Sequence, residues 1–87
     1  MADTLTTAQK APLLVDGNPI RYGAITWSVD QTGIINVADD GNSGTDVFGL
    51  AEGTVTLTVS EGNRTGADVI TVTGAPLAVT LGSPEPA

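Results

Sequence analysis

The chain has 87 residues, which is enough for one small domain and too short for two hydrophobic cores. Ten acidic residues against three basic ones give a net charge of −7, which disfavours nucleic acid and anionic lipid as partners. The sequence contains neither histidine nor cysteine, so the usual general bases, thiol nucleophiles and zinc ligands are missing. Composition therefore predicts a protein that is not an enzyme and needs no cofactor.

The N-terminal part is expected to consist of an extension or first edge strand over residues 1–11. Within it, residues 7–11 offer the only helical turn, which Pro12 would end. The first clear strand is predicted at residues 12–15, closed by the turn sequence of residues 16–19. No signal-peptide pattern opens the sequence, so we expect synthesis as a cytoplasmic protein.

Short β-type segments follow, separated by Gly, Asn and Asp. Residues 25–30 alternate between apolar and polar side chains, and a turn leads into a strand at residues 34–38. Residues 39–44 are polar and rich in glycine, which predicts an exposed loop before a strand at residues 45–50.

The most regular alternation lies at residues 54–60, where Val55, Leu57 and Val59 alternate with threonine and serine. This pattern is typical of an antiparallel sheet with one packed face. Further strands are predicted at residues 68–73 and 77–81, followed by a flexible tail over residues 82–87. About seven short strands at this spacing predict an all-β fold, either a sandwich or a small barrel.

Two motifs resemble bacterial immunoglobulin-like domains of the Big-2 type. The first is Trp-Ser-Val-Asp-Gln-Thr-Gly-Ile-Ile-Asn-Val at residues 27–37, and the second is Gly-Leu-Ala-Glu-Gly-Thr-Val-Thr-Leu-Thr-Val at residues 49–59. Residues 77–81 with the tail also resemble the ends of small free-standing members in tailed-phage and prophage gene sets. The resemblance implies an immunoglobulin-like antiparallel β-sandwich over residues 12–81. It also implies a structural or binding module of a virion or of a bacterial surface protein.

The core is expected to form around Trp27, the only tryptophan, because a buried aromatic hides a large share of the apolar surface in so small a domain. We expect its indole and the valine-leucine-valine row to point inward from opposing sheets and to meet. Phe48 is expected in the core, and Tyr22 either packs at a strand edge or makes a binding contact. The predicted core residues are Trp27, Val29, Ile34, Val37, Val55, Leu57, Val59, Ile70 and Val72.

Calcium is the one metal that the sequence suggests. Asp39, Asp40 and Asp46 offer hard oxygen ligands in or beside a flexible loop. Their spacing differs from that of an EF-hand, so a solvated acidic loop is the favoured interpretation and no metal site is predicted. Gly53 precedes the most regular strand, where a positive φ or a close backbone approach is expected.

These observations leave two main functional hypotheses, beside a third of a calcium- or glycan-binding sandwich. The first is a virion-associated capsid or tail decoration protein, and the second is a spacer or adhesion module on a bacterial cell surface. Either would bind a protein, meaning a virion or cell-surface component, or a carbohydrate, without contacting nucleic acid or membrane. Exposed edge strands would also allow a homo-oligomer.

Overall fold

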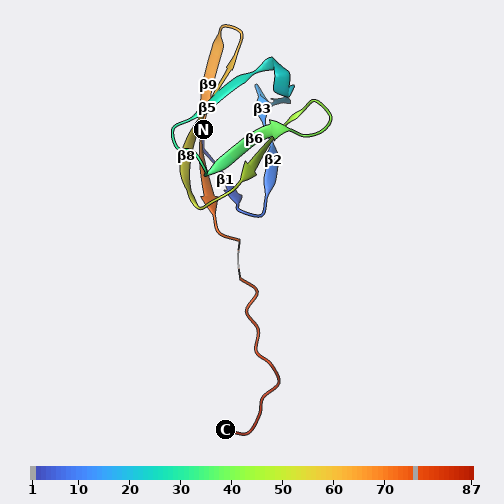
Figure 1. Cartoon of the computed structure of the whole chain (residues 1–87), viewed down its shortest axis with the longest axis vertical. Helices are drawn as coiled ribbons and strands as arrows, with labels where there is room; N and C mark the ends of the chain where they lie inside the picture. Colours follow the sequence, from blue (N-terminus) through green and yellow to red (C-terminus); the bar gives the residue numbers. More distant parts are fainter. Residues whose placement is uncertain (1, 76) are drawn as a thin grey trace.

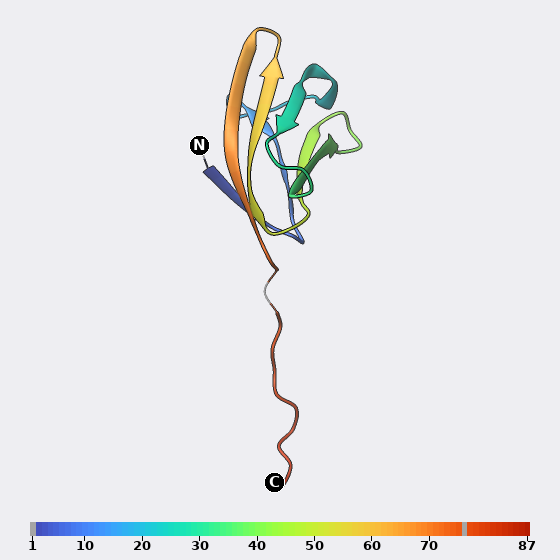
Figure 2. The same cartoon turned by 60° about the vertical axis from the view of Figure 1, so that its left-hand side comes forward.

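A computed structural model describes residues 2–75 and 77–87. Its strands form two packed layers, with an extended C-terminal segment that leaves the body at one end (Figures 1 and 2). The longest dimension of the chain is 69 Å against 27 and 21 Å for the other two, because this segment projects away from the body. The all-β sandwich predicted from the sequence is confirmed.

Within the described residues, the first layer is a four-stranded sheet in the order β1-β9-β8-β5, and the second is a three-stranded sheet in the order β2-β7-β6. A two-residue pair, β3-β4, lies beside them. The element bounds are β1 Ala2–Thr6, β2 Lys10–Pro12, β3 Leu14–Val15, β4 Asn18–Pro19, η1 Tyr22–Ala24, β5 Thr26–Val29, β6 Ile35–Asp39, β7 Thr45–Gly49, β8 Gly53–Glu61 and β9 Arg64–Thr73.

One strand pair departs from the expected antiparallel arrangement. β1 runs parallel to β9, with Ala2 opposite Val69 and Thr6 opposite Thr73. The other strand pairs are antiparallel, including the long β8–β9 hairpin, which turns at Gly62 with φ of +60°. Residues 1–11 were left open between an extension and an edge strand, and residues 2–6 are an edge strand.

The core fills the space between the two layers. It consists of side chains from both sheets that are at most 8% exposed: Leu5, Ile35, Val37, Val47, Val55, Leu57, Ile70 and Val72. Five of the predicted core residues are among these, while Trp27, Val29, Ile34 and Val59 are half-buried against them. Tyr22 also packs against the core, as edge packing predicted.

The expected meeting of Trp27 with the valine-leucine-valine row across the two sheets is wrong. β5 and β8 are neighbours in one sheet, so Trp27 lies opposite Val59 and Val29 lies opposite Leu57. The residues that face this row belong to β6 and β7 of the other sheet. Alternation identified the inward faces, but it carries no information about which strands are neighbours.

Three local expectations are also corrected. Residues 7–11 form a tight turn and the start of β2 instead of a helical turn, because Gly49 N–H donates to Gln9 O and draws the chain into the second sheet. The strand expected at residues 12–15 is divided between β2 and β3, since Leu13 N–H donates to Thr45 O. Residues 77–81 contain no strand.

The two ends of the sandwich differ. At the closed end, around Leu5, Ile35, Gly49, Gly53 and Val72, the two layers pack tightly together. There Gly53 has φ of +154°, which confirms the expected positive φ, and a Cβ on it would lie 2.8 Å from the side-chain atom Ile34 Cδ1. At the open end, the β8–β9 turn and the β3–β4 pair stand apart from the core and are joined by an ion pair, in which the Arg64 guanidinium lies 2.6 Å from an Asp16 carboxylate oxygen.

Candidate binding surfaces

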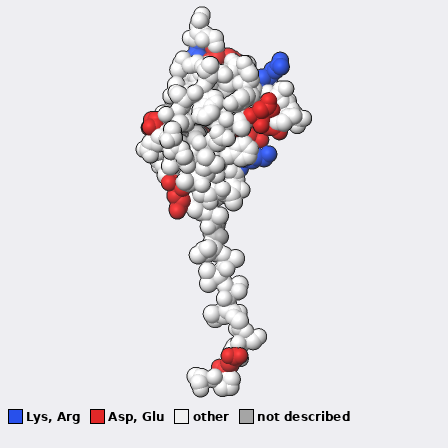
Figure 3. Space-filling model, in the orientation of Figure 1, with Lys and Arg blue, Asp and Glu red and all other residues white. Residues whose placement is uncertain are grey.

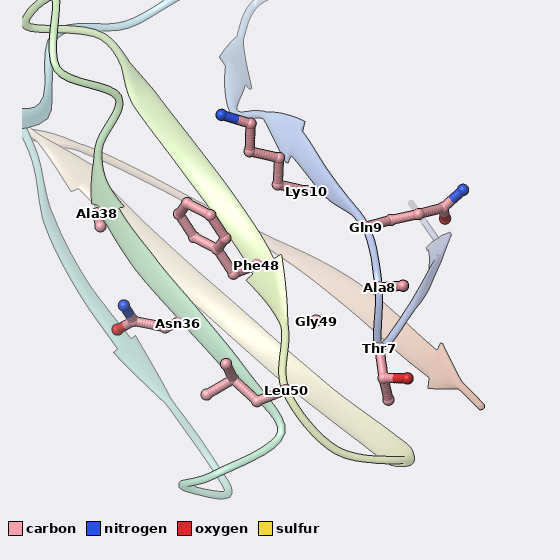
Figure 4. A pocket seen from close by; sticks show the side chains of 9 residues that line it. All are labelled: Thr7, Ala8, Gln9, Lys10, Asn36, Ala38, Phe48, Gly49 and Leu50. Carbon is pink, nitrogen blue, oxygen red and sulfur yellow. The ribbon is translucent and has the colours of Figure 1, made fainter. Parts of the chain in front are cut away.

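The outer face of the three-stranded sheet carries a shallow hollow of about 660 Å³. Figure 4 shows Phe48 on β7 at its centre, with Asn36 and Ala38 of β6 on one side and Lys10 of β2 on the other. Leu50, half exposed, closes one end. Phe48 therefore points away from the core, and its predicted core position is wrong: residues 45 and 47 take the inward positions of this strand.

Lys10 contacts two side chains of β7 on this surface. Its ammonium lies 5.8 Å from the centre of the Phe48 ring and 3.3 Å from Asp46 Oδ2. The Asp46 side chain is largely buried, so the lysine supplies the charge that a buried carboxylate requires. The hollow thus combines an aromatic ring, an amide and a cation, which is a combination suited to a polar ligand with an apolar face.

The three calcium candidates are not gathered into one site. Asp39 Oδ1 accepts hydrogen bonds from the N–H groups of Gly41 and Ser43, and Asp40 Oδ1 accepts from Asn42 and Gly44. Asp46 is bound to Lys10 instead. These bonds shape the β6–β7 loop. Across residues 2–75 and 77–87, no three acidic side chains come close enough together to hold a metal ion.

A second depression lies at the open end, between β9, the start of β1 and the segment around β3. We call it the β9 groove; it has a volume of about 770 Å³. Its apolar lining includes Leu14, Val59 and Ile70, and its polar lining includes Asp3 and Asp68. Along the groove, the first half of β9 has no neighbouring strand on its outer edge, because β1 pairs only with residues 69–73.

Asp68 is the unusual group in this groove. It lies on the same side of β9 as Ile70 and Val72, directly opposite the buried Leu57 of β8. Its Oδ1 is buried and has no hydrogen-bond partner among the described residues. Burial, and then the neighbouring Asp3 carboxyl, raise the pKa of Asp68 to about 6.

Sequence reasoning missed the residues that make both surfaces. Phe48 was assigned to the core, Lys10 was not considered, and the Asp3–Asp68 pair joins segments 65 residues apart in the chain. A signal existed for Asp68 alone, since an acidic residue stands in the alternating positions that Ile70 and Val72 continue inward. In the described part of the chain, no helix has the length and apolar character that a membrane span requires.

No family model matches the sequence, and no curated protein is significantly similar to it. Among solved structures, the chain is similar to the crystal structure of domains 4 and 5 of the S-layer protein SbsC. The TM-score is 0.57 and the sequence identity is 26% over 82% of this chain. The match covers 46% of the other chain, so this protein spans about half the length of that two-domain structure.

Proposed function

We propose that this chain is a non-catalytic structural module of a bacterial cell surface, with the outer face around Phe48 as its contact surface. The likeness to domains of an S-layer protein carries the proposal, because it extends over most of the chain and over both layers of the sandwich. A fold does not fix a function by itself, so the contact surface has to be argued from its own chemistry.

The surface around Phe48 suits the polymers of a cell envelope. An aromatic ring stacks on the apolar face of a sugar or packs against an apolar side chain, while Asn36 and Lys10 donate hydrogen bonds to the polar groups around it. The Phe48 ring stands on a strand paired on both sides, and the Lys10–Asp46 ion pair holds the ammonium beside it. A preformed site of this kind loses little entropy on binding.

Membership of the Big-2 type of immunoglobulin-like domain is part of the same proposal. It is supported by the two motifs at residues 27–37 and 49–59, which form β5, β6 and β8 with the turns before and between them. The virion-associated role stays a prediction, since nothing in the fold or in the structural likeness bears on it. A cell-surface location is part of the proposal that the chain is a surface module, and the same experiment tests both.

Co-sedimentation of the purified chain with bacterial cell envelopes tests the proposal. We expect the native chain to bind, and Phe48→Ala to weaken binding at least roughly tenfold through loss of an aromatic anchor. The matched control is Val69→Ala, which shortens an exposed side chain of the other sheet. Envelopes stripped of protein show whether the polymer or a protein is bound. Absence of binding to both preparations, or equal binding by both variants, would contradict the proposal.

A further inference from the structure

The C-terminal segment is similar in sequence to the first strand, with three of four residues the same. Residues 78–81 read Ala-Val-Thr-Leu, and residues 2–5 of β1 read Ala-Asp-Thr-Leu. The leucine of β1, Leu5, is its one side chain buried in the core. Leu81 occupies the corresponding position in the tail and is 96% exposed. The tail therefore carries a segment similar to the edge strand, without a sheet to bind in this structure.

The tail would fit the position of β1 with a more apolar inner face. In the β1 register, Ala78 falls opposite Val69 and Leu81 opposite Val72. Because side chains of a strand alternate between its two faces, Leu77, Val79 and Leu81 would then all point inward. β1 itself places Asp3 and Leu5 on that face. The three tail side chains are 80–96% exposed in the chain as it stands.

In the exchanged strand Val79 would take the position of Asp3, which lies beside Asp68. Asp3 stands beside Asp68 in the β9 groove, and two carboxylates at close range repel each other. Val79 in place of Asp3 removes this repulsion and covers apolar surface of the groove. Leu77, one position before Ala78, would extend the new strand along the free edge of β9, opposite Asp68.

The tail cannot reach this position within its own molecule. Only four residues separate Thr73, the end of β9, from Ala78. A connection between two parallel strands requires a dozen residues or more, because the chain must return to the start of the first strand. In Figures 1 and 2 the tail indeed runs away from the body, in the direction that β9 leaves it. The acceptor must therefore be another molecule.

We propose that the tail segment 77–82 of one molecule binds to β9 of a second copy of this chain in the place of β1, with its apolar side chains in the β9 groove. The domain carries many carboxylates and would repel an acidic segment. The tail has no charged side chain before Glu85, so charge favours the tail as the segment that binds in the groove (Figure 3). The tail would take over the backbone hydrogen bonds that β1 makes with residues 69–73 of β9, and Leu77 would begin to cover the unpaired edge at Asp68.

Such a contact joins two different surfaces, a donor tail and an acceptor groove. After the first contact the donor still has a free groove and the acceptor still has a free tail, so copies associate head to tail into a ring or an open series. This inference goes beyond the proposed envelope binding, because the face around Phe48 takes no part in it. Either can fail while the other holds.

Sedimentation velocity of the full chain over a range of concentrations tests the association. We expect assembly that increases with concentration, and monomers only for the double variant Val79→Asp/Leu81→Asp, which places charges on the inward side. The matched control is Ala78→Asp/Thr80→Asp, which adds the same charge on the outward side and should still assemble. All four positions lie outside the folded body, so neither variant threatens folding. A native chain that stays monomeric, or assembly that survives the inward charges, overturns the proposal.

Cysteine cross-linking tests the register. A chain with Ala78→Cys is mixed with a chain carrying Val69→Cys, which should lie directly opposite in the exchanged strand; the native sequence has no cysteine to interfere. We expect a disulfide-linked dimer, because opposite residues of neighbouring strands are within reach of a disulfide. The control pair, Ala78→Cys with Thr73→Cys, is four residues out of register and should link far more slowly. Equal yields for both pairs would show that the tail does not take the place of β1.

Discussion

The closed end and the open end of the sandwich are built from the same two long strands and behave differently. At the closed end, Val55 of β8 and Val72 of β9 are almost fully buried, and β1 covers the outer edge of β9. At the open end, residues 64–67 are exposed, an aspartate replaces the next inward apolar residue, and the edge of β9 is free. The β8–β9 hairpin thus provides both buried core residues at one end and a surface that can accept a partner at the other.

The difference shows how a very small domain divides its apolar residues. There is not enough apolar surface to cover both ends, so stability is concentrated where β1, β7, β8 and β9 meet. Asp68 marks the boundary, since it has the inward direction of a core residue and the chemistry of a surface residue. Substitutions on either side of this boundary should therefore differ greatly in effect.

The largest effect is expected for Leu57→Ala. Leu57 is 1% exposed, and its loss leaves a cavity between the sheets that should lower the free energy of unfolding by about 2–5 kcal/mol. Thr58→Ala, on the next residue and the opposite face of the same strand, is the control and should cost less than about 1 kcal/mol. Urea unfolding followed by tryptophan fluorescence measures both. Similar losses for the two variants would contradict the assignment of faces.

A smaller loss is expected for Gly49→Ala at the closed end. A Cβ at this position would collide with the backbone carbonyl of Thr6, where β1 approaches β7, so one of the two strands must move. We expect about 1–3 kcal/mol of destabilisation, as for other overpacked sites. Gly66→Ala at the open end has free space around its Cβ and should be nearly neutral. Thermal unfolding of the two variants compares the ends directly.

A change in pH should act on the boundary residue. Asp68 keeps its proton up to about pH 6 in the folded chain and up to about pH 4 in the unfolded chain. The folded state therefore binds more protons between these values, and stability falls as the pH rises from about 4 to about 6. Asp68→Asn should remove this dependence and stabilise the chain at pH 7 by about 1 kcal/mol, allowing for solvent screening.

The control for this pH effect is Glu85→Gln in the tail, which removes one carboxylate without touching the fold. Its unfolding midpoint should follow the native pH profile. If Asp68→Asn also followed it, the raised pKa of Asp68 would not be the source of the dependence.

The smallest effect is expected for Arg64→Ala. The ion pair with Asp16 lies in solvent at the open end, and exposed pairs of this kind contribute little to stability. We expect an unfolding midpoint within error of the native value, while amide exchange at the β8–β9 turn becomes faster. A large loss of global stability would mean that the open end belongs to the cooperative core.

Side-chain alternation was enough to predict an all-β fold and the inward faces of its long strands, and the resemblance of the two motifs selected the sandwich. Val55 and Leu57 are buried as expected because their strand is flanked on both sides and needs only one apolar face. β1 was left undecided because only Leu5 among its residues is buried, and its parallel pairing with β9 joins the two ends of the sequence. Pairing between distant segments leaves no local pattern to read.

For the tail the error is the reverse: the sequence predicted a strand that the structure does not contain. The alternation of Leu77, Val79 and Leu81 is a genuine strand pattern, yet the segment forms no strand because no partner edge is within its reach. The surfaces could not be predicted for a related reason. Phe48 and Lys10 meet only through the pairing of β2 with β7, and Asp3 meets Asp68 only through the pairing of β1 with β9.

The parallel arrangement of β1 and β9 has a mechanical consequence. If the molecule is pulled at its two ends, the force enters at the start of β1 and leaves at the end of β9, along the direction of both strands. The hydrogen bonds between them are then loaded side by side, in shear, and must break together. A hairpin pulled at its open end would instead unzip one bond at a time. This topology resists tension along the chain axis more than its few strand-pairing bonds would suggest.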